Sequence, residues 1–290
     1  MIHVSQLAPD GQWDQTMLFD LFANKLYPTG LEFSHRLGYV RRGAKGSIVI
    51  IPGRYWSKER DYAQINDALM HYEWVLAIRT SDEEDSFDIE RIAHANIKWW
   101  VQTPKAGVFY DARFIPLGYP PHFSEMGVQP RKAIDVFLAA QNTHQRRQEA
   151  FRALKEVPEG RQQVTLPTKG FLQGLDQVAY REAMLETKVA PCPSGAVSPD
   201  TFRVYEALQA HAVPIADDIS PAYDSIGYWR KLFHDVPFPI IENYDVLQPM
   251  VNHVLPDWQR ESNRIAAWWM AQKRAMALNL AMDLDHLGAL

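Results

Sequence analysis

The sequence predicts an α/β protein with two halves, each built on a parallel sheet flanked by helices, followed by a long C-terminal helix. Short apolar runs of strand length alternate with stretches whose apolar residues repeat at helical spacing. This alternation restarts after a stretch rich in proline and glycine at residues 118–130. A last helical pattern occupies residues 257–283. Repeated strand, helix and strand indicate parallel sheets, because parallel strands need crossover connections.

The first half contains four predicted strands. Residues 47–51 read Ser-Ile-Val-Ile-Ile, a continuous apolar run that is typical of a strand buried on both faces. An amphipathic pattern predicts a helix at residues 14–26. The predicted strands lie at 46–52, 73–80, 97–102 and 113–117, and further helices are predicted at 61–71 and 88–94.

The second half repeats the pattern. Its predicted strands begin at residues 133, 162, 189 and 212, and its predicted helices span 144–155, 175–186 and 201–210. The stretch at 118–130 is the predicted linker. We therefore expect three parts: residues 1–130, residues 131–256 and a C-terminal helix at 257–290.

Residues 189–217 carry the clearest functional signal, VAPCPSGAVSPDTFRVYEALQAHAVPIAD. A strand, a small-residue loop, a helix and a second strand point backbone N–H groups and a helix N-terminus at one spot, which suits a phosphate. Arg203 and Glu206 lie one helical turn apart and can reach the same ligand. The alternative is an ion pair on an exposed helix face, worth about 0.2–0.5 kcal/mol.

This motif resembles the sugar-nucleotide half of GT-B glycosyltransferases, and of the exostosin-like group in particular. The resemblance implies two Rossmann-like domains that face a cleft, an acceptor-side domain at 1–130 and a donor domain at 131–256, with the last helix crossing back to the first. It also implies that Ser194, Gly195 and Arg203 hold the diphosphate of a UDP-sugar co-substrate. Glu206 would bind the ribose. No other cofactor is expected.

Further donor-binding candidates follow other strands of the second half. Thr143 can cap the helix that starts there, and Arg146 or Arg147 can counter the diphosphate charge. The alternative is that these basic residues form the solvent-exposed start of a helix. Neither arginine is preferred over the other as the diphosphate contact. Lys169 either reaches the nucleotide or is a surface lysine.

Asp82 and Glu83 are the predicted catalytic residues, because they follow a buried strand and a transferase needs a base for the acceptor hydroxyl. Asp82 lies nearer the strand end and is preferred. A solvated acidic loop is the alternative, and His94 and His122 are rival bases.

No metal site is expected. The sequence has no HExxH, no paired CxxC and no EF-hand loop, and the acidic run contains no Asp-x-Asp. Ser198 stands where many retaining GT-B enzymes have a glutamate, which favours an inverting mechanism, although a retaining one stays open.

Several classes of acceptor fit the sequence. Arg54 and Arg79 are its predicted contacts, and a nearby basic group can contact the phosphates of DNA or be ordinary surface charge: Arg41, Arg42, Lys45, Lys58 and Arg60. A hydroxymethylpyrimidine in phage DNA, a glycan and a small molecule are alternatives. The net charge of −5 gives no general attraction to nucleic acid.

The single Cys192 and the distribution of apolar residues indicate where in the cell the protein works. One cysteine excludes a disulfide within the chain, and no run approaches the roughly 18 apolar residues that span a bilayer. We therefore expect a cytoplasmic protein of a bacterium or a phage-infected cell. A hypothesis of another class is a non-catalytic two-lobed protein that binds a phosphorylated ligand.

Overall fold

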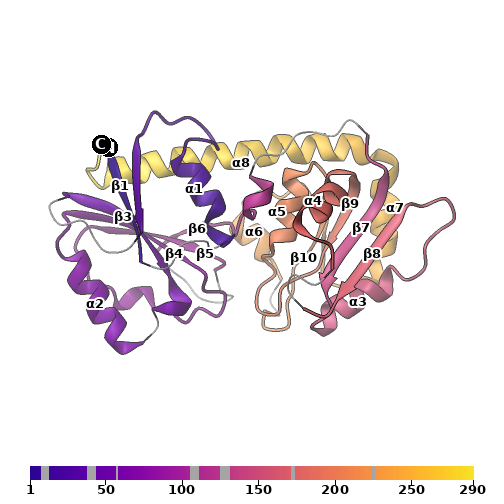
Figure 1. Ribbon diagram of the computed structural model, residues 1–290, viewed down its shortest axis with the longest axis horizontal. Coiled ribbons are helices and arrows are strands. Elements are labelled where there is room, and N and C mark those ends of the chain that lie inside the picture. The colour runs from indigo at the N-terminus through magenta and orange to yellow at the C-terminus, as the bar shows by residue number, and fades with distance from the viewer. Residues whose placement is uncertain are drawn as a thin grey trace. The chain divides into compact units, whose positions relative to one another are not determined.

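The computed structural model describes residues 1–7, 13–37, 44–56, 58–104, 111–124, 131–170, 174–223 and 226–290. The chain forms two compact units: unit 1 comprises Met1–Leu117 and Ala271–Leu290, and unit 2 comprises Gly118–Met270. Each unit contains a parallel sheet with helices packed beside it (Figure 1). The predicted α/β class, the two parallel sheets and the long C-terminal helix are confirmed.

The sheet of unit 1 has six strands among the described residues, in the order β2-β1-β3-β4-β5-β6, and all neighbours pair in parallel. The strands are β1 (Ile2–Gln6), β2 (Phe33–Leu37), β3 (Gly46–Pro52), β4 (Trp74–Thr80), β5 (Ile97–Gln102) and β6 (Arg113–Ile115). Strands β3 and β4 are buried along their whole length, which explains their continuous apolar sequences.

Two α-helices accompany this sheet before the C-terminal helix, α1 (Thr16–Phe22) and α2 (Glu59–Leu69). Tyr62, Ile65 and Leu69 of α2 belong to the hydrophobic core that includes residues of β3 and β4. Short 3-10 turns lie at η1 (Trp13–Gln15), η2 (Gly53–Tyr55) and η3 (Ile89–Arg91). The short helix predicted at 88–94 is present only as the 3-10 turn η3, which the Asp88 side chain caps by accepting from Glu90 N.

Helix α8 (Trp258–His286) ends in unit 1, where a buried carboxylate fastens it. Asp283 accepts hydrogen bonds from Trp100 Nε1 at 2.8 Å and Arg113 Nε at 2.9 Å, and Lys98 Nζ lies 3.1 Å from its Oδ1. The three donors come from β5 and β6, so Asp283 fixes the end of α8 to these strands.

The sheet of unit 2 has five parallel strands among the described residues, in the order β11-β10-β9-β7-β8. They are β7 (Ile134–Gln141), β8 (Gln163–Thr168), β9 (Thr187–Cys192), β10 (Val213–Asp217) and β11 (Ile240–Ile241). The helices are α3 (Gln145–Ala153), α4 (Gln177–Leu185), α5 (Phe202–Gln209), α6 (Tyr228–Leu232) and α7 (Leu247–Val254), with 3-10 turns η4 (Pro121–Phe123), η5 (Tyr244–Val246) and η6 (Leu255–Asp257).

Parallel pairing brings the carboxyl ends of β7, β9 and β10 to one edge of the unit 2 sheet. Ligands of open α/β sheets bind at this edge. In the part of the chain that the structure describes, no helix combines the length and the apolar character needed to cross a membrane.

Candidate functional site

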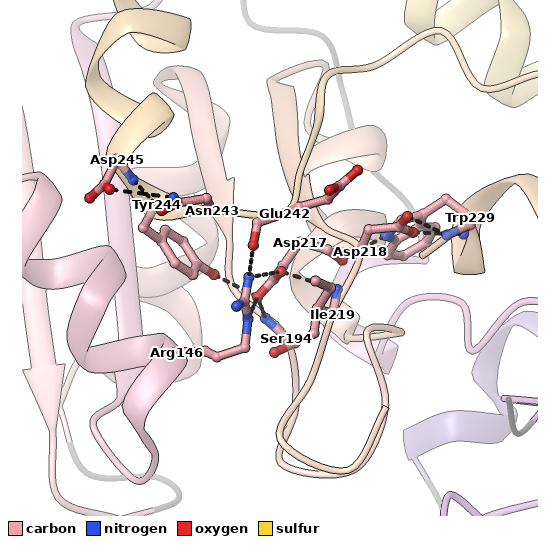
Figure 2. Close-up of polar contacts among 11 residues, drawn as sticks. Arg146, Ser194, Asp217, Asp218, Ile219, Trp229, Glu242, Asn243, Tyr244 and Asp245 are labelled. Carbon is pink, nitrogen blue, oxygen red and sulfur yellow. Dashed lines mark hydrogen bonds and ion pairs between the residues drawn. The ribbon is translucent and has the colours of Figure 1, made fainter. Parts of the chain in front are cut away.

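Asp217, the last residue of β10, is the centre of a polar network at the carboxyl edge of the unit 2 sheet (Figure 2). Its side chain is fully buried and forms a two-bond ion pair with Arg146, with Nε 2.7 Å from Oδ2 and Nη2 2.5 Å from Oδ1. The Tyr244 hydroxyl donates to Oδ2 at 2.8 Å, and Ser194 N donates to the same atom at 3.4 Å. This carboxylate therefore ties α3, η5 and the loop after β9 to the end of β10.

The two arginines at the start of α3 have different partners. Arg146 adds a hydrogen bond to the Glu242 carbonyl at 3.0 Å, and its guanidinium carbon lies 5.1 Å from the centre of the Tyr244 ring. Arg147 Nε donates to the Ser194 carbonyl at 3.0 Å. The predicted contact of either arginine with a diphosphate stays a prediction. In this structure Arg146 forms an ion pair with the buried Asp217 carboxylate, whereas Arg147 hydrogen-bonds to the loop between β9 and α5.

Helix α3 begins one residue later than the sequence suggested. Its N-cap is His144, so the prediction that Thr143 caps the helix is wrong. The Thr143 side chain is exposed, and Lys169 is exposed directly after β8. Their proposed contacts with a donor stay predictions.

The loop between β9 and α5 is held by contacts inside unit 2. Gly195 N donates to the Ser198 carbonyl at 2.9 Å, and Asp200 N donates to Ser198 Oγ at 3.1 Å. The buried Asp200 carboxylate accepts from the hydroxyls of Tyr205 at 2.6 Å and Tyr228 at 3.0 Å. These contacts fix the backbone in front of α5 before any ligand arrives.

Two buried hydroxyl groups at this loop lack a hydrogen-bond partner within the described part of the chain. Ser194 is 0% exposed and Thr201 is 8% exposed, yet Ser194 Oγ and Thr201 Oγ1 bond to nothing. Thr201 is the N-cap of α5, but its side chain does not cap the helix. A buried polar group without a partner costs about 1–3 kcal/mol. Both hydroxyls therefore keep unused hydrogen-bonding capacity beside the N-terminus of α5.

His144 lies at the same edge of the unit 2 sheet, and its ring nitrogens are also buried. Both ring nitrogens are shielded from solvent, and the Ser194 backbone lies within hydrogen-bonding reach of the ring. Burial lowers the pKa of this imidazole, with neighbouring Arg147 acting in the same direction, which favours the neutral ring. A neutral imidazole can donate one hydrogen bond to a ligand oxygen.

Arg203 and Glu206 are turned into unit 2, so the alternative of an exposed ion pair is wrong. Glu206 is 7% exposed, and its Oε2 accepts from the Tyr180 hydroxyl at 2.6 Å. Arg203 donates to the Ala139 carbonyl of β7 through Nη2 at 2.7 Å and Nε at 3.1 Å. Burial raises the pKa of Glu206, while Arg203 and Tyr180 act against the shift. Cys192 lies beside this pair, and burial raises the pKa of its thiol.

The predicted catalytic Asp82 closes its own loop in unit 1. Its Oδ1 accepts from Ser86 N at 2.9 Å and Ser86 Oγ at 2.6 Å, and its Oδ2 accepts from Phe87 N at 2.9 Å. The side chain is 2% exposed. A Cβ on Gly53 would lie 2.6 Å from Asp82 Oδ2, so the packing here requires glycine. Glu83 is exposed.

The predicted acceptor contacts lie in contrasting settings. Arg79 is 0% exposed, ion-paired with Asp85 and bonded to the Phe87 carbonyl at 3.0 Å, so it supports the loop that Asp82 closes. Arg54 is exposed and donates to the Tyr55 hydroxyl at 2.6 Å.

The remaining predicted residues are the alternative bases, His94 and His122, and the basic group near Arg54. His94 bonds the Tyr72 carbonyl at 3.0 Å and Asn96 N at 3.2 Å. Burial lowers the pKa of His122, helped by Arg181. Arg41 and Arg42 lie outside the described residues.

Sequence reasoning assigned no role in the site to Thr201, His144 or Tyr180. Thr201 had a readable signal, since it directly precedes the helix and threonine is a common N-cap. The other two become visible only when α3 and α4 are placed beside β9 and α5.

Within the described ranges, no group of three or more His, Cys, Asp or Glu side chains is placed to hold a metal ion. Neither the comparison with protein-family models nor that with curated proteins finds a match to the chain.

Proposed function

We propose that unit 2 binds a nucleotide-diphosphate sugar, with UDP as the nucleotide, and that the chain is a metal-independent, inverting glycosyltransferase. The observation that carries the proposal is the pair of buried hydroxyls of Ser194 and Thr201, which have no hydrogen-bond partner among the described residues. They lie on either side of a fixed loop at the N-terminus of α5. A diphosphate supplies acceptor oxygens for both.

Charge at this edge also suits a diphosphate. The backbone N–H groups at a helix N-terminus attract an anion, and Arg147 holds the Ser194 carbonyl beside the loop. The Tyr205 and Tyr228 hydroxyls satisfy the Asp200 carboxylate and keep it buried. These contacts keep the loop in place before a phosphate binds.

Glu206 is suited to the ribose of the same nucleotide. A carboxylate accepts hydrogen bonds from neighbouring hydroxyls, and Tyr180 fixes the orientation of this one at 2.6 Å. Arg203 lies one turn earlier on the helix and is partly buried beside Glu206, where its charge favours the ionised form of the carboxylate. A buried charge that bonds a ligand discriminates more strongly than an exposed one.

The proposal is tested by measuring the thermal stability of the purified protein with a series of sugar nucleotides, followed by release of free nucleotide. A donor at 100 times its Kd stabilises the folded state by about 2.7 kcal/mol. Stabilisation by a UDP-sugar together with slow release of UDP supports a transferase. Stabilisation without release supports a binding protein, and no stabilisation by any sugar nucleotide contradicts the proposal.

The acceptor is a hydroxyl compound: a hydroxymethylpyrimidine in DNA, a glycan or a small molecule. Lys58, Arg60 and Arg54 are exposed in unit 1 and can contact phosphates. Affinity for duplex DNA that falls steeply between low and high salt supports the DNA acceptor. Absence of DNA binding at low salt leaves the glycan and the small molecule.

A further inference from the structure

The N-termini of two helices border the loop that contains Ser194 in unit 2. Helix α3 begins after its N-cap, His144, and Arg147 in its first turn donates through Nε to the Ser194 carbonyl at 3.0 Å. Helix α5 begins after Thr201, at the far end of the same loop. The N–H groups at a helix N-terminus carry partial positive charge, so two ends of positive potential lie beside this loop. The arrangement suits a ligand with two anionic groups.

Three polar side chains at this loop have hydrogen-bonding capacity to spare. Ser194 Oγ and Thr201 Oγ1 lack a partner among the described residues, although the two residues are only 0% and 8% exposed. The His144 side chain does not cap its own helix, and both of its ring nitrogens are shielded from solvent. The Ser194 backbone lies within hydrogen-bonding reach of this ring. The imidazole therefore belongs to the same polar cluster as the Ser194 hydroxyl.

The two arginines at the start of α3 differ from His144 in how their charge is used. The Arg146 guanidinium forms two hydrogen bonds with the buried Asp217 carboxylate, which offsets its charge (Figure 2). Arg147 holds the Ser194 carbonyl through Nε. Both arginines keep their charge with or without a ligand, because a guanidinium does not lose its proton in proteins. The charge of an imidazole, in contrast, can change when a ligand binds.

The groups around the ring determine its charge before a ligand binds. Burial lowers the pKa of His144, Arg147 and Arg146 act in the same direction, and the Ser194 backbone and Asp217 act against the shift. The imidazole of the free protein is therefore neutral at about pH 7.5. A phosphate within about 4–6 Å favours the charged ring, because an opposite charge raises the pKa of a histidine. Binding of a phosphate next to the ring is then coupled to uptake of a proton from solvent.

We propose that His144 contacts the terminal phosphate of the bound nucleotide diphosphate and, as an imidazolium, balances the charge that this phosphate gains when the sugar leaves. The inference rests on the proposed glycosyl transfer and needs only residues of unit 2. The bond between the anomeric carbon and the phosphate oxygen breaks, and its electron pair stays on that oxygen. The anomeric carbon forms its new bond to the acceptor oxygen, whose proton passes to a base or to water. His144 keeps its own proton and donates a hydrogen bond to the phosphate oxygen.

The change in charge lets His144 distinguish the product from the donor. A UDP-sugar carries a single negative charge on each phosphate, whereas UDP above about pH 6 carries a second charge on its terminal phosphate. The imidazolium therefore favours UDP over the UDP-sugar. It also favours the transition state, in which this second charge develops, over the ground state.

Titration calorimetry of UDP at about pH 7.5, in two buffers with different ionisation enthalpies, counts the protons that the complex takes up. UDP is almost fully ionised at this pH, so its own phosphate releases few protons. We expect the unsubstituted protein to take up as much as about one proton per UDP. Its Kd for UDP rises by up to about tenfold per pH unit between about pH 7.5 and 8.5, the slope for one coupled proton.

His144→Gln keeps a hydrogen-bond donor at this position but cannot gain a charge. We expect this variant to bind UDP without proton uptake, with a Kd that does not change over the same pH range, and to lose most of the preference for UDP over the UDP-sugar. His144→Asn is the second variant, because asparagine is a favoured N-cap and preserves α3. The matched control is His253→Gln, the same change at an exposed position on α7 of unit 2, which keeps the proton uptake.

The outcomes that overturn the assignment differ from those that overturn the proposed function. UDP binding without proton uptake by the unsubstituted protein, or with the same uptake in His144→Gln, rejects His144 and leaves the nucleotide site intact. A loss of UDP affinity in both His144 variants that is equal at every pH contradicts a role through charge. Absence of UDP binding by the unsubstituted protein rejects the proposed function, and the role of His144 with it.

Discussion

The Tyr180 hydroxyl donates a hydrogen bond of 2.6 Å to the buried carboxylate of Glu206. The contact joins α4 to α5, and it occupies one oxygen of the residue that we assign to the ribose. Burial raises the pKa of both groups. Tyr180 therefore decides how Glu206 is oriented, and it stabilises unit 2 at the same time.

Replacing Tyr180 by phenylalanine removes this donor and leaves a buried carboxylate with one partner fewer. We expect Tyr180→Phe to lower the free energy of unfolding by about 1.5–3 kcal/mol, as for hydrogen bonds to charged groups. Urea unfolding followed by circular dichroism measures the change. Tyr55→Phe, at an exposed position of unit 1, is the control. Equal stability of Tyr180→Phe and the unsubstituted protein would show that the contact contributes nothing.

Glu206→Gln tests the assignment to the ribose. The amide keeps the shape but loses the charge and half of the acceptor capacity, so the Kd for a UDP-sugar rises about tenfold, or 1.4 kcal/mol. Glu182→Gln, on the exposed side of α4, keeps the original Kd. Titration calorimetry measures both. An unchanged Kd in Glu206→Gln removes this residue from the site.

The pKa of Asp283 predicts how the free energy of unfolding changes at acidic pH. Burial acts to raise its pKa, but the hydrogen bonds from Arg113, Trp100 and Lys98 outweigh burial and the net pKa is lowered. A lowered pKa stabilises the fold above the ordinary value of 3.8, and this contribution is lost as the pH falls through the folded value.

Asp283→Asn therefore destabilises the protein at pH 7 by about 1–3 kcal/mol, the contribution of hydrogen bonds to a charged group whose cationic partners are each 35% exposed. The difference from the unsubstituted protein shrinks below about pH 4. Asp285→Asn, exposed two residues further along α8, is the control for both measurements. A difference that stays constant with pH argues against the ionised carboxylate as the cause.

The pKa of Lys132 predicts how the free energy of unfolding changes at alkaline pH. Its ammonium group donates to the Leu185 and Ala210 carbonyls, both at 2.8 Å, and so satisfies the ends of α4 and α5. Burial lowers the pKa of Lys132 from 10.5 to about 8. The folded protein then releases this proton before the unfolded chain does, so the free energy of unfolding gains a contribution as the pH rises from about 8 towards 10.5.

Lys132→Met abolishes this pH-dependent contribution and lowers stability at every pH, because two carbonyls lose their donor. The measurement is the difference in unfolding free energy between the two proteins across pH 7 to about 10. Lys155→Met, at an exposed position after α3, serves as the control. A difference that narrows with rising pH would contradict the assigned direction of the shift.

The fold was predictable where burial left a simple pattern. Strands β3 and β4 are buried on both faces, so their sequences are continuous apolar runs. Strands β1 and β2 were missed because polar residues such as Ser5, Gln6 and His35 interrupt their apolar pattern. Gln6 is nevertheless buried, since Gln15 and His35 satisfy its amide.

The candidate site was predictable only in part. The loop and helix after β9 could be read locally, but the direction in which Arg203 and Glu206 point could not, because inward and outward faces share the same spacing. Asp217 and Arg146 are 71 residues apart, and only the sheet order brings them together.

The central claim is that the unpartnered hydroxyls before α5 bind the diphosphate of a sugar nucleotide, and titration of UDP into Thr201→Val tests it most directly. Valine keeps the shape but has no hydroxyl, and Thr165→Val on β8 is the matched control. We predict that Thr201→Val raises the Kd for UDP about tenfold and that Thr165→Val leaves it unchanged. Equal affinity of Thr201→Val and the unsubstituted protein, or no binding of UDP by either, would contradict the account.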